Sequence, residues 1–266
     1  MTTTELGEAL HAGRMVFGTL LVSPSPRFTQ AVSGGGLDFV FIDLEHIAMD
    51  REQVSWMCQA YAALGLPPLV RIPSPDPYAA TQVLDGGAAG VIAPYVESVE
   101  EVRALRGAVK LRPIKGARLQ SFLEGAPCEP ELAEYIRERS SKNLLIINIE
   151  SVPAMAALDE ILKVPDIDAI LIGPHDLSCS MGLPEKYDHP DFLEAVRTIF
   201  RKARAAGVGA GIHFSGDVAQ QAGFIRDGGN FIIHSSDIQL FARHLAGEIA
   251  VLRQSSGTSS APTINI

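Results

Sequence analysis

Short apolar segments of strand length alternate with longer stretches of helical periodicity along almost the whole chain. The apolar segments are continuous, which is typical of parallel strands that are covered on both faces. Eight such segments are predicted to be strands, at residues Met15–Leu21, Phe39–Asp43, Pro68–Arg71, Gly90–Ala93, Leu144–Ile149, Ala169–Ile172, Val208–His213 and Phe231–His234. Eight strand–helix units in 266 residues favour an α/β fold, a closed (β/α)₈ TIM barrel, over an open doubly wound sheet.

The stretches between the strands carry helix start signals. Asp50 and Ser98 each stand three residues before a Gln or Glu, the pattern of a capping box. Residues 111–131 are predicted to form the one long irregular connection, between the fourth and fifth strands. Because no internal linker interrupts the pattern, we expect a single barrel domain over residues 1–253 and a polar C-terminal tail over residues 254–266.

Composition narrows the class of protein. The net charge of −9 argues against a nucleic-acid partner, which would need a basic face. The three cysteines are widely spaced and form no CxxC pair, so neither a disulfide framework nor a zinc knuckle is expected. The apolar run at residues 15–22 is too short to span a bilayer and lacks the features of a signal peptide. We therefore expect a soluble, cytoplasmic protein with no membrane partner.

Polar side chains follow most of the predicted strands. In a (β/α)₈ barrel, the loops that follow the strands carry the chemistry, so these side chains should share one rim. They are Asp43, Glu45 and His46 after the second strand, Arg71 at the end of the third, Asn148 and Glu150 at the fifth, His175 and Asp176 after the sixth, His213 at the seventh, and His234 and Asp237 at the eighth.

Glu150 and Asp176 follow neighbouring strands. Because adjacent strands lie about 5 Å apart, two carboxylates at the same barrel end can share one cation. Carboxylates without a thiolate or histidine cluster suit a hard divalent ion that keeps several waters, Mg²⁺ or Mn²⁺, with Co²⁺ as a further candidate. Each carboxylate could instead cap the helix that follows it, but the pairing favours metal ligands.

His46 and Arg71 complete the candidate chemistry. An imidazole that titrates near neutrality can act as a general base, although a lone rim histidine more often has a structural role. The planar guanidinium of Arg71 could bind an oxyanion or form a salt bridge to Asp43 or Glu45. A metal, an arginine and a base around one pocket predict enolate chemistry.

Two other chemistries are disfavoured by the residues present. A Schiff-base mechanism needs a lysine inside the barrel, and none of the six lysines ends a predicted strand. A zinc hydrolase would need an HxH at a strand end or an HExxH helix, and the sequence contains neither.

Several segments together resemble the HpcH/HpaI aldolase and citrate lyase family, and within it the metal-dependent class II pyruvate aldolases. The matching segments extend over roughly residues 15–245, and they are "FIDLEH", "LVRIP", "VLDGGAAGVIAPYVES", "IINIES", "DEILKVPDIDAILIGPHDLSCSMG" and "AGI". The resemblance implies a (β/α)₈ barrel.

The resemblance also implies a role for individual residues. Glu150 and Asp176 match the residues that hold the metal, His46 matches the general base, and Arg71 matches the arginine that stabilises the enolate. Asp85 matches an aspartate that raises the basicity of this histidine.

The expected substrate contacts are made by Arg71, Asn148, Gly173, Pro174 and His175. Many relatives carry Gln where Asn148 stands, and a small residue or Asn where His175 stands. Reversible cleavage of a 4-hydroxy-2-oxo acid to pyruvate and an aldehyde is the implied activity. The small-molecule partners are therefore a 2-oxo acid and an aldehyde.

Two alternative functions stay open at this point. One is a lyase of the same family that acts on an acyl-CoA ester, for which only "LRPIKGAR" offers a basic cluster. The other is a non-catalytic barrel that binds a small acid, which would not need a base.

Asp85 bears on the oligomeric state. It precedes the fourth strand and should lie at the barrel end opposite to His46, more than about 15 Å away. A family-like pairing with His46 would therefore need a neighbouring subunit. The hexamer that the resemblance implies, a trimer of dimers, would provide one, whereas Asp85 could also simply cap the turn at "DGG".

Overall fold

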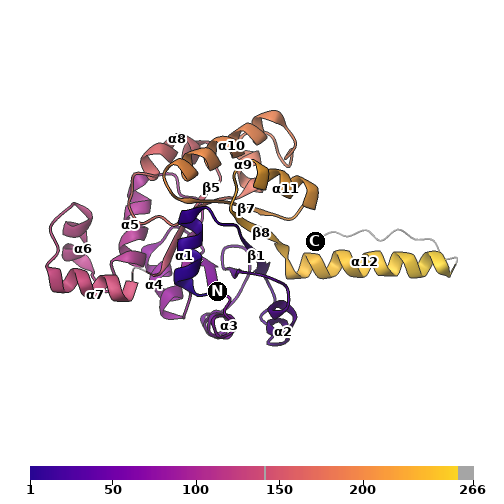
Figure 1. The fold of residues 1–266 in the computed structure, drawn as a ribbon, viewed down its shortest axis with the longest axis horizontal. Helices are drawn as coiled ribbons and strands as arrows, with labels where there is room; N and C mark the ends of the chain where they lie inside the picture. The colour runs from indigo at the N-terminus through magenta and orange to yellow at the C-terminus, as the bar shows by residue number, and fades with distance from the viewer. Residues whose placement is uncertain (141, 257–266) are drawn as a thin grey trace.

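The chain forms a closed barrel of eight parallel strands in the order β1 to β8, with helices around it (Figure 1). The computed structural model describes residues 1–140 and 142–256. The (β/α)₈ prediction is confirmed, and six of the eight predicted strands begin where predicted. The strands are β1 (Val16–Leu21), β2 (Phe39–Asp43), β3 (Pro68–Arg71), β4 (Gly90–Ala93), β5 (Leu144–Ile149), β6 (Ala169–Ile172), β7 (Gly209–Phe214) and β8 (Phe231–Ser236).

Helices follow the strands, and most of them cover the outside of the barrel (Figure 1). They are α1 (Thr3–Ala12), α2 (Arg27–Ser33), α3 (Arg51–Ala63), α4 (Pro77–Asp85), α5 (Val99–Lys110), α6 (Gly116–Leu123), α7 (Pro130–Ser140), α8 (Val152–Ile161), α9 (Pro174–Ser180), α10 (Pro190–Ala205), α11 (Val218–Arg226) and α12 (Asp237–Ser255).

The two predicted capping boxes are present. Asp50 and Ser98 accept hydrogen bonds from the backbone N–H groups three residues on, at the starts of α3 and α5. The expectation that residues 111–131 are irregular is wrong, because α6 forms within them and α7 begins at Pro130. Helix α6 begins at Gly116, whose φ of 60° is a conformation that glycine adopts without strain.

Two layers of apolar side chains build the core. Alternate strand residues point into the barrel, and the others pack against the surrounding helices. Helix α1 closes the end of the barrel at which the strands begin: its Leu6 and Leu10 join the inner cluster, which includes Leu144 and Ala169 at strand starts. The opposite end of the barrel remains for polar groups.

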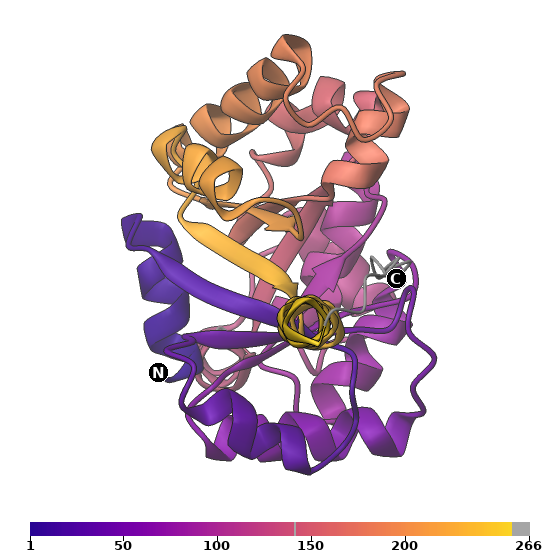
Figure 2. The same cartoon turned by 90° about the vertical axis from the view of Figure 1, so that its right-hand side faces the viewer.

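Helix α12 does not cover the barrel (Figures 1 and 2). It projects away from it, and Figure 2 looks almost along its axis. Of the described residues of α12, only Asp237 is buried. The helix continues to Ser255, two residues beyond the domain end expected at residue 253. Most of the expected polar tail, residues 257–266, lies outside the described residues.

Candidate active site

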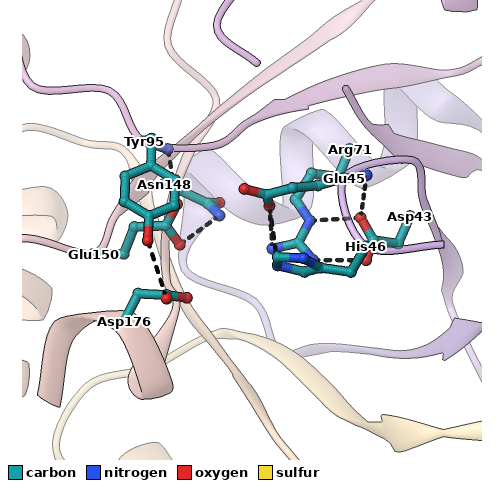
Figure 3. A network of polar contacts seen from close by, with 8 residues as sticks. All are labelled: Asp43, Glu45, His46, Arg71, Tyr95, Asn148, Glu150 and Asp176. Carbon is teal, nitrogen blue, oxygen red and sulfur yellow. Dashed lines mark hydrogen bonds and ion pairs between the residues drawn. The ribbon is translucent and has the colours of Figure 1, made fainter. Parts of the chain in front are cut away.

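Two carboxylates from neighbouring strands meet at the end of the barrel where the strands finish. Glu150 follows β5, and Asp176 lies in the first turn of α9 after β6. Tyr95, which follows β4, contacts both (Figure 3): its backbone N–H donates to Glu150 Oε1 at 2.7 Å, and its phenol donates to Asp176 Oδ1 at 3.1 Å. The expected convergence of this pair is therefore visible in the structure.

Neither carboxylate serves as a helix cap. Ser151, not Glu150, is the N-cap of α8, and Gly173 is the N-cap position of α9. Asp176 lies inside the first turn, where a negative charge interacts favourably with the helix dipole. The helix-cap interpretation therefore does not hold for Glu150, which is buried.

Gly173 is required beside Glu150 because space is short. A Cβ atom built at Gly173 would lie 2.2 Å from Glu150 Oε2. The same oxygen accepts a hydrogen bond from Asn148 Nδ2 at 3.0 Å. Both oxygens of Glu150 are thus held, one by a backbone amide and one by a side-chain amide, so the orientation of the carboxylate is fixed.

A second polar group comes from the ends of β2 and β3. Arg71 donates from Nε and Nη2 to the two oxygens of Asp43, both at 2.7 Å, in a bidentate pair. Its Nη1 lies 2.9 Å from Glu45 Oε2, an ion-pair distance, although that oxygen accepts no well-aligned hydrogen bond. The salt-bridge interpretation of Arg71 is therefore realised, and it fixes the guanidinium at the rim. His46 is exposed, with Nε2 3.5 Å from Glu45 Oε2.

The site holds more carboxylates than cationic side chains, and the pKa values of two of these carboxylates are raised. Burial raises the pKa of Glu150 to about 7; the Tyr95 N–H opposes this rise, and the charges of Glu45 and Asp176 add to it. Burial also raises the pKa of Glu45, against the attraction of Arg71. At Asp43 the hydrogen bonds and charge of Arg71 outweigh burial, and the pKa is lowered. Arg71 thus stabilises the negative charge of Asp43 strongly, whereas its attraction does not offset the burial of Glu150.

Tyr95 has a conformation that tyrosine rarely adopts. Its φ of 48° is in the left-handed region, which costs about 1–3 kcal/mol for a residue other than glycine. Burial and the adjacent Asp176 raise the pKa of its phenol to about 12, so the hydroxyl stays protonated and can donate. The residue is otherwise half-exposed at the mouth of the site.

The oxygen atoms at this centre fit a hard divalent cation. Asn148 is buried, and its Oδ1 has no hydrogen-bond partner among the described residues. Glu150 and Asp176 supply two hard oxygen ligands, but no group of three or more His, Cys, Asp or Glu side chains that could hold a metal occurs in the described parts of the chain. Two carboxylates and an unpaired carbonyl oxygen suit Mg²⁺ or Mn²⁺ with waters or substrate completing the coordination, and do not suit Zn²⁺.

The other residues expected at the substrate site lie around this centre. Gly173 and Pro174 join β6 to α9, next to Glu150. His175 is exposed, with Nδ1 3.6 Å from Glu185 Oε1. It is therefore placed at the rim beside Asp176.

The strand-end histidines of β7 and β8 do not join these groups by any described contact. His213 points into the barrel, with Nε2 3.1 Å from the carbonyl oxygen of Ser235, and burial lowers its pKa to about 4. His234 contacts Gln221 Oε1 through Nδ1 at 2.6 Å. Both are held by structural partners.

Asp85 lies far from this site, as expected. It is the last residue of α4, at the end of the barrel where β4 begins, and its exposed carboxylate pairs with Arg112 of the same chain. It lines a groove between α3 and α4 together with Gln82 and Gly86. No described contact joins it to His46.

One residue of the site, Tyr95, is not among the residues predicted from the sequence. Tyr95 lies in "IAPYVES" directly after a predicted strand, so the rule that picked out the other strand ends would have found it had it been applied to β4. Glu45 is the ion-pair partner of Arg71 that the sequence offered beside Asp43, whereas its contact with His46 depends on side-chain geometry that spacing does not reveal.

Comparisons with known proteins decide the family. The sequence profile of the HpcH/HpaI aldolase/citrate lyase family matches residues 17–244. The chain belongs to the HpcH/HpaI aldolase/citrate lyase family. It is 29% identical over 254 residues to the 2-keto-3-deoxy-L-rhamnonate aldolase of Shigella boydii serotype 4, covering 95% of this chain and 94% of that protein.

Solved structures of similar proteins agree in fold. The HpcH/HpaI aldolase from Desulfitobacterium hafniense DCB-2 superposes with a TM-score of 0.81 at 27% identity, covering 97% of this chain and 99% of the other. The citrate synthase SbnG gives a TM-score of 0.80 at 27% identity, covering 95% and 98%. As a member of the HpcH/HpaI family, the chain is an enzyme of carbon–carbon bond chemistry, an aldolase or lyase. Within the described residues, no helix is long and apolar enough to cross a membrane.

Proposed function

We propose that this HpcH/HpaI family member is a divalent-metal-dependent aldolase. It cleaves a 4-hydroxy-2-oxo acid to pyruvate and an aldehyde, and it also catalyses the reverse addition. The proposal rests on the two carboxylates of Glu150 and Asp176, which both accept hydrogen bonds from Tyr95. They face Arg71 and His46 across the rim of the barrel (Figure 3). The Shigella relative acts, by its name, on a 2-keto-3-deoxy acid, which belongs to the same substrate class.

Each side chain has a task in this reaction. Glu150 and Asp176 would hold Mg²⁺ or Mn²⁺, and such a cation would supply Lewis-acid polarisation of the 2-oxo group. His46, exposed at the rim, accepts the proton of the 4-hydroxyl group as the C3–C4 bond breaks. The electrons of that bond form the pyruvate enolate, and the proton is then returned to C3.

Arg71 is preorganised for the charge that develops. Its bidentate pair with Asp43 and its ion pair with Glu45 fix the guanidinium before substrate arrives. A fixed positive charge next to the keto oxygen stabilises the enolate without a reorganisation cost. Asn148 Oδ1, which has no hydrogen-bond partner among the described residues, can accept a hydrogen bond from the substrate.

The acyl-CoA alternative is disfavoured by the position of its basic cluster. The segment "LRPIKGAR" follows α5, whose last residue, Lys110, pairs with Asp168 at the barrel end opposite to Glu150. Arg112 and Arg118 are further neutralised by Asp85 and Glu129. This cluster therefore does not border the proposed site within one chain.

The experiment is pyruvate release from racemic 4-hydroxy-2-oxo acids, before and after EDTA and after return of Mg²⁺ or Mn²⁺. Glu150→Gln and Asp176→Asn should each abolish the metal-restored activity, because each removes an anionic ligand. Glu160→Gln, which changes an exposed carboxylate on α8, is the control and should leave it unchanged. Near-wild-type turnover of either ligand variant would refute the assignment.

The proposal includes a homo-oligomer, with the trimer of dimers as its expected form. The uncovered side of α12 supports it, because apolar side chains recur there at helical spacing and are substantially exposed: Ile238, Phe241, Leu245, Ile249 and Leu252. A second copy of the chain would cover such a stripe. Subunit contacts would also allow Asp85 of one chain to approach His46 of another.

Subunit mixing tests the shared site. Homo-oligomers of His46→Ala and of Asp85→Ala should both be weakly active. When they are dissociated and reassembled together, interfaces that carry both native residues should restore part of the activity. No recovery in mixed oligomers verified by mass, or a fully active monomer, would show that Asp85 is not shared.

A further inference from the structure

Tyr95 contacts both candidate metal-binding carboxylates through two different parts of one residue. The backbone N–H reaches Glu150, 55 residues along the chain, and the phenol reaches Asp176, 81 residues along the chain (Figure 3). The ladders that pair β4 with β5 and β5 with β6 end just before these residues, at Ala93, Ile149 and Ile172. Beyond the strand ends, Tyr95 links the two carboxylates by hydrogen bonds.

The backbone conformation of Tyr95 depends on these contacts. A left-handed φ at a residue other than glycine persists only where the surroundings hold it. In this conformation the N–H points to Glu150 Oε1 while the side chain extends to Asp176 Oδ1. Both contacts come from one residue, so they restrict how far apart the two carboxylates can lie.

We propose that Tyr95 is a positioning residue of the metal site, which orients the carboxylates of Glu150 and Asp176 toward the cation. This inference rests on the proposed function. Each carboxylate oxygen has about two acceptor positions, so the donors on Glu150 and Asp176 leave positions free for a metal. Groups that hydrogen-bond to metal ligands restrict their rotation, and removing such a group typically weakens metal binding about 10–100-fold.

A different role for the phenol would give the opposite result. If the Tyr95 hydroxyl occupied the place of the cation on Asp176, the metal would have to displace it. Removing the hydroxyl would then leave metal binding unchanged or make it tighter. The sign of the change in affinity therefore separates a positioning group from a competitor.

The test is Tyr95→Phe, which removes the hydroxyl and retains the ring and the backbone N–H. Binding of Mn²⁺ alone to the metal-stripped protein is measured by the electron paramagnetic resonance signal of free Mn²⁺. We expect the dissociation constant to rise about tenfold. Tyr135→Phe, which removes the hydroxyl of a tyrosine on α7, is the control and should bind Mn²⁺ as the wild type does. An unchanged or lower dissociation constant for Tyr95→Phe overturns the proposal.

Turnover at different Mn²⁺ concentrations separates positioning from catalysis. Tyr95→Phe should lose activity at low Mn²⁺ and regain turnover to within about twofold at saturating Mn²⁺, since metal affinity is the property that it changes. A kcat that stays about 10²-fold low at saturation would make the phenol a participant in the chemistry and overturn the positioning role. Equal thermal unfolding midpoints verify that the variant is folded.

Mn²⁺ binding by Glu150→Gln, measured in the same way, tests the proposed metal site separately from the role of Tyr95. If Glu150→Gln still binds Mn²⁺ like the wild type, the proposed metal site itself is wrong. If Glu150→Gln loses binding while Tyr95→Phe retains it, the metal site stands and only the inference about Tyr95 fails.

Discussion

Two buried carboxylates at opposite ends of the same barrel have very different surroundings. Asp168, just before β6, is paired with Lys110 Nζ at 2.7 Å and with His11 Nε2 at 3.1 Å, and it accepts the N–H of Leu145 at 2.7 Å. Glu150, just after β5, has two neutral amide donors and lies among other carboxylates. Both are at most 5% exposed, so burial alone does not separate them.

The difference shows what each end of the barrel does. At the end closed by α1, the charge of Asp168 is compensated by cations of the chain, which ties α1 and α5 to the strands. At the open end, Arg71 is committed to Asp43 and Glu45, and Glu150 has no cationic side chain in hydrogen-bond contact among the described residues. A buried carboxylate without a cationic partner is costly, and such sites are associated with function.

The largest effect is expected for the base. His46→Ala should reduce aldol cleavage about 10²–10⁴-fold, because it removes the group that takes the hydroxyl proton. Affinity for Mn²⁺ and the free energy of unfolding should change little, since the imidazole is 61% exposed. A large loss of Mn²⁺ binding in this variant would instead identify His46 as a ligand and remove its role as base.

At the closed end of the barrel the effect should fall on stability. Asp168→Asn keeps the shape of the side chain but leaves Lys110 buried without its carboxylate. We expect a loss of about 3–5 kcal/mol in the free energy of unfolding, measured by urea denaturation. At temperatures where the variant is folded, kcat should be close to wild type. If Asp168→Asn were as stable as the wild type but inactive, Asp168 would serve catalysis and not stability, contrary to this prediction.

Gly173→Ala probes the open end without a change in charge. The added Cβ would fall 2.2 Å from Glu150 Oε2, so the carboxylate must move. A displacement of about 1 Å at a catalytic group can lower the rate about 10²-fold, and we expect a loss of that size in kcat/KM. Gly247→Ala, on α12, where a Cβ meets open space, is the matched control. Wild-type activity of Gly173→Ala would mean that the orientation of Glu150 is unimportant.

The smallest effect concerns His11 and pH. Its Nδ1 faces the carbonyl oxygen of Gly207 and its Nε2 faces Asp168, and because both partners are acceptors, only the doubly protonated imidazolium satisfies them. The hydrogen bond to Asp168 accordingly raises the pKa of His11, against the effect of burial.

Stability from a raised histidine pKa is fully present below about pH 6.5 and is lost as the pH rises through the higher folded value. The imidazole is 46% exposed, so solvent screening limits the contribution to about 0.5 kcal/mol. Urea denaturation at several pH values should show this loss in the wild type and not in His11→Gln. A parallel pH dependence in both proteins would contradict the role of His11.

The sequence predicted the barrel and much of the rim for a clear physical reason. Continuous apolar runs define the strands, and strand ends define which polar residues share one face, so Glu150 and Asp176 could be paired from spacing alone. The left-handed φ of Tyr95 and its contacts with both carboxylates could not be predicted from the sequence, because they depend on the path of a loop. The partners His11 and Asp168 are 157 residues apart and follow no common motif. Helix α6 has no start signal in the sequence, because its N-cap residue, a lysine, makes no capping hydrogen bond.

Calorimetric titration of Mn²⁺ into the metal-stripped protein tests the difference between the two ends most directly. The wild type and folded Asp168→Asn should each bind one Mn²⁺ per chain with similar affinity, whereas Glu150→Gln and Asp176→Asn should show no binding in the same concentration range. Retained Mn²⁺ binding in Glu150→Gln, or its loss in folded Asp168→Asn, would contradict the account.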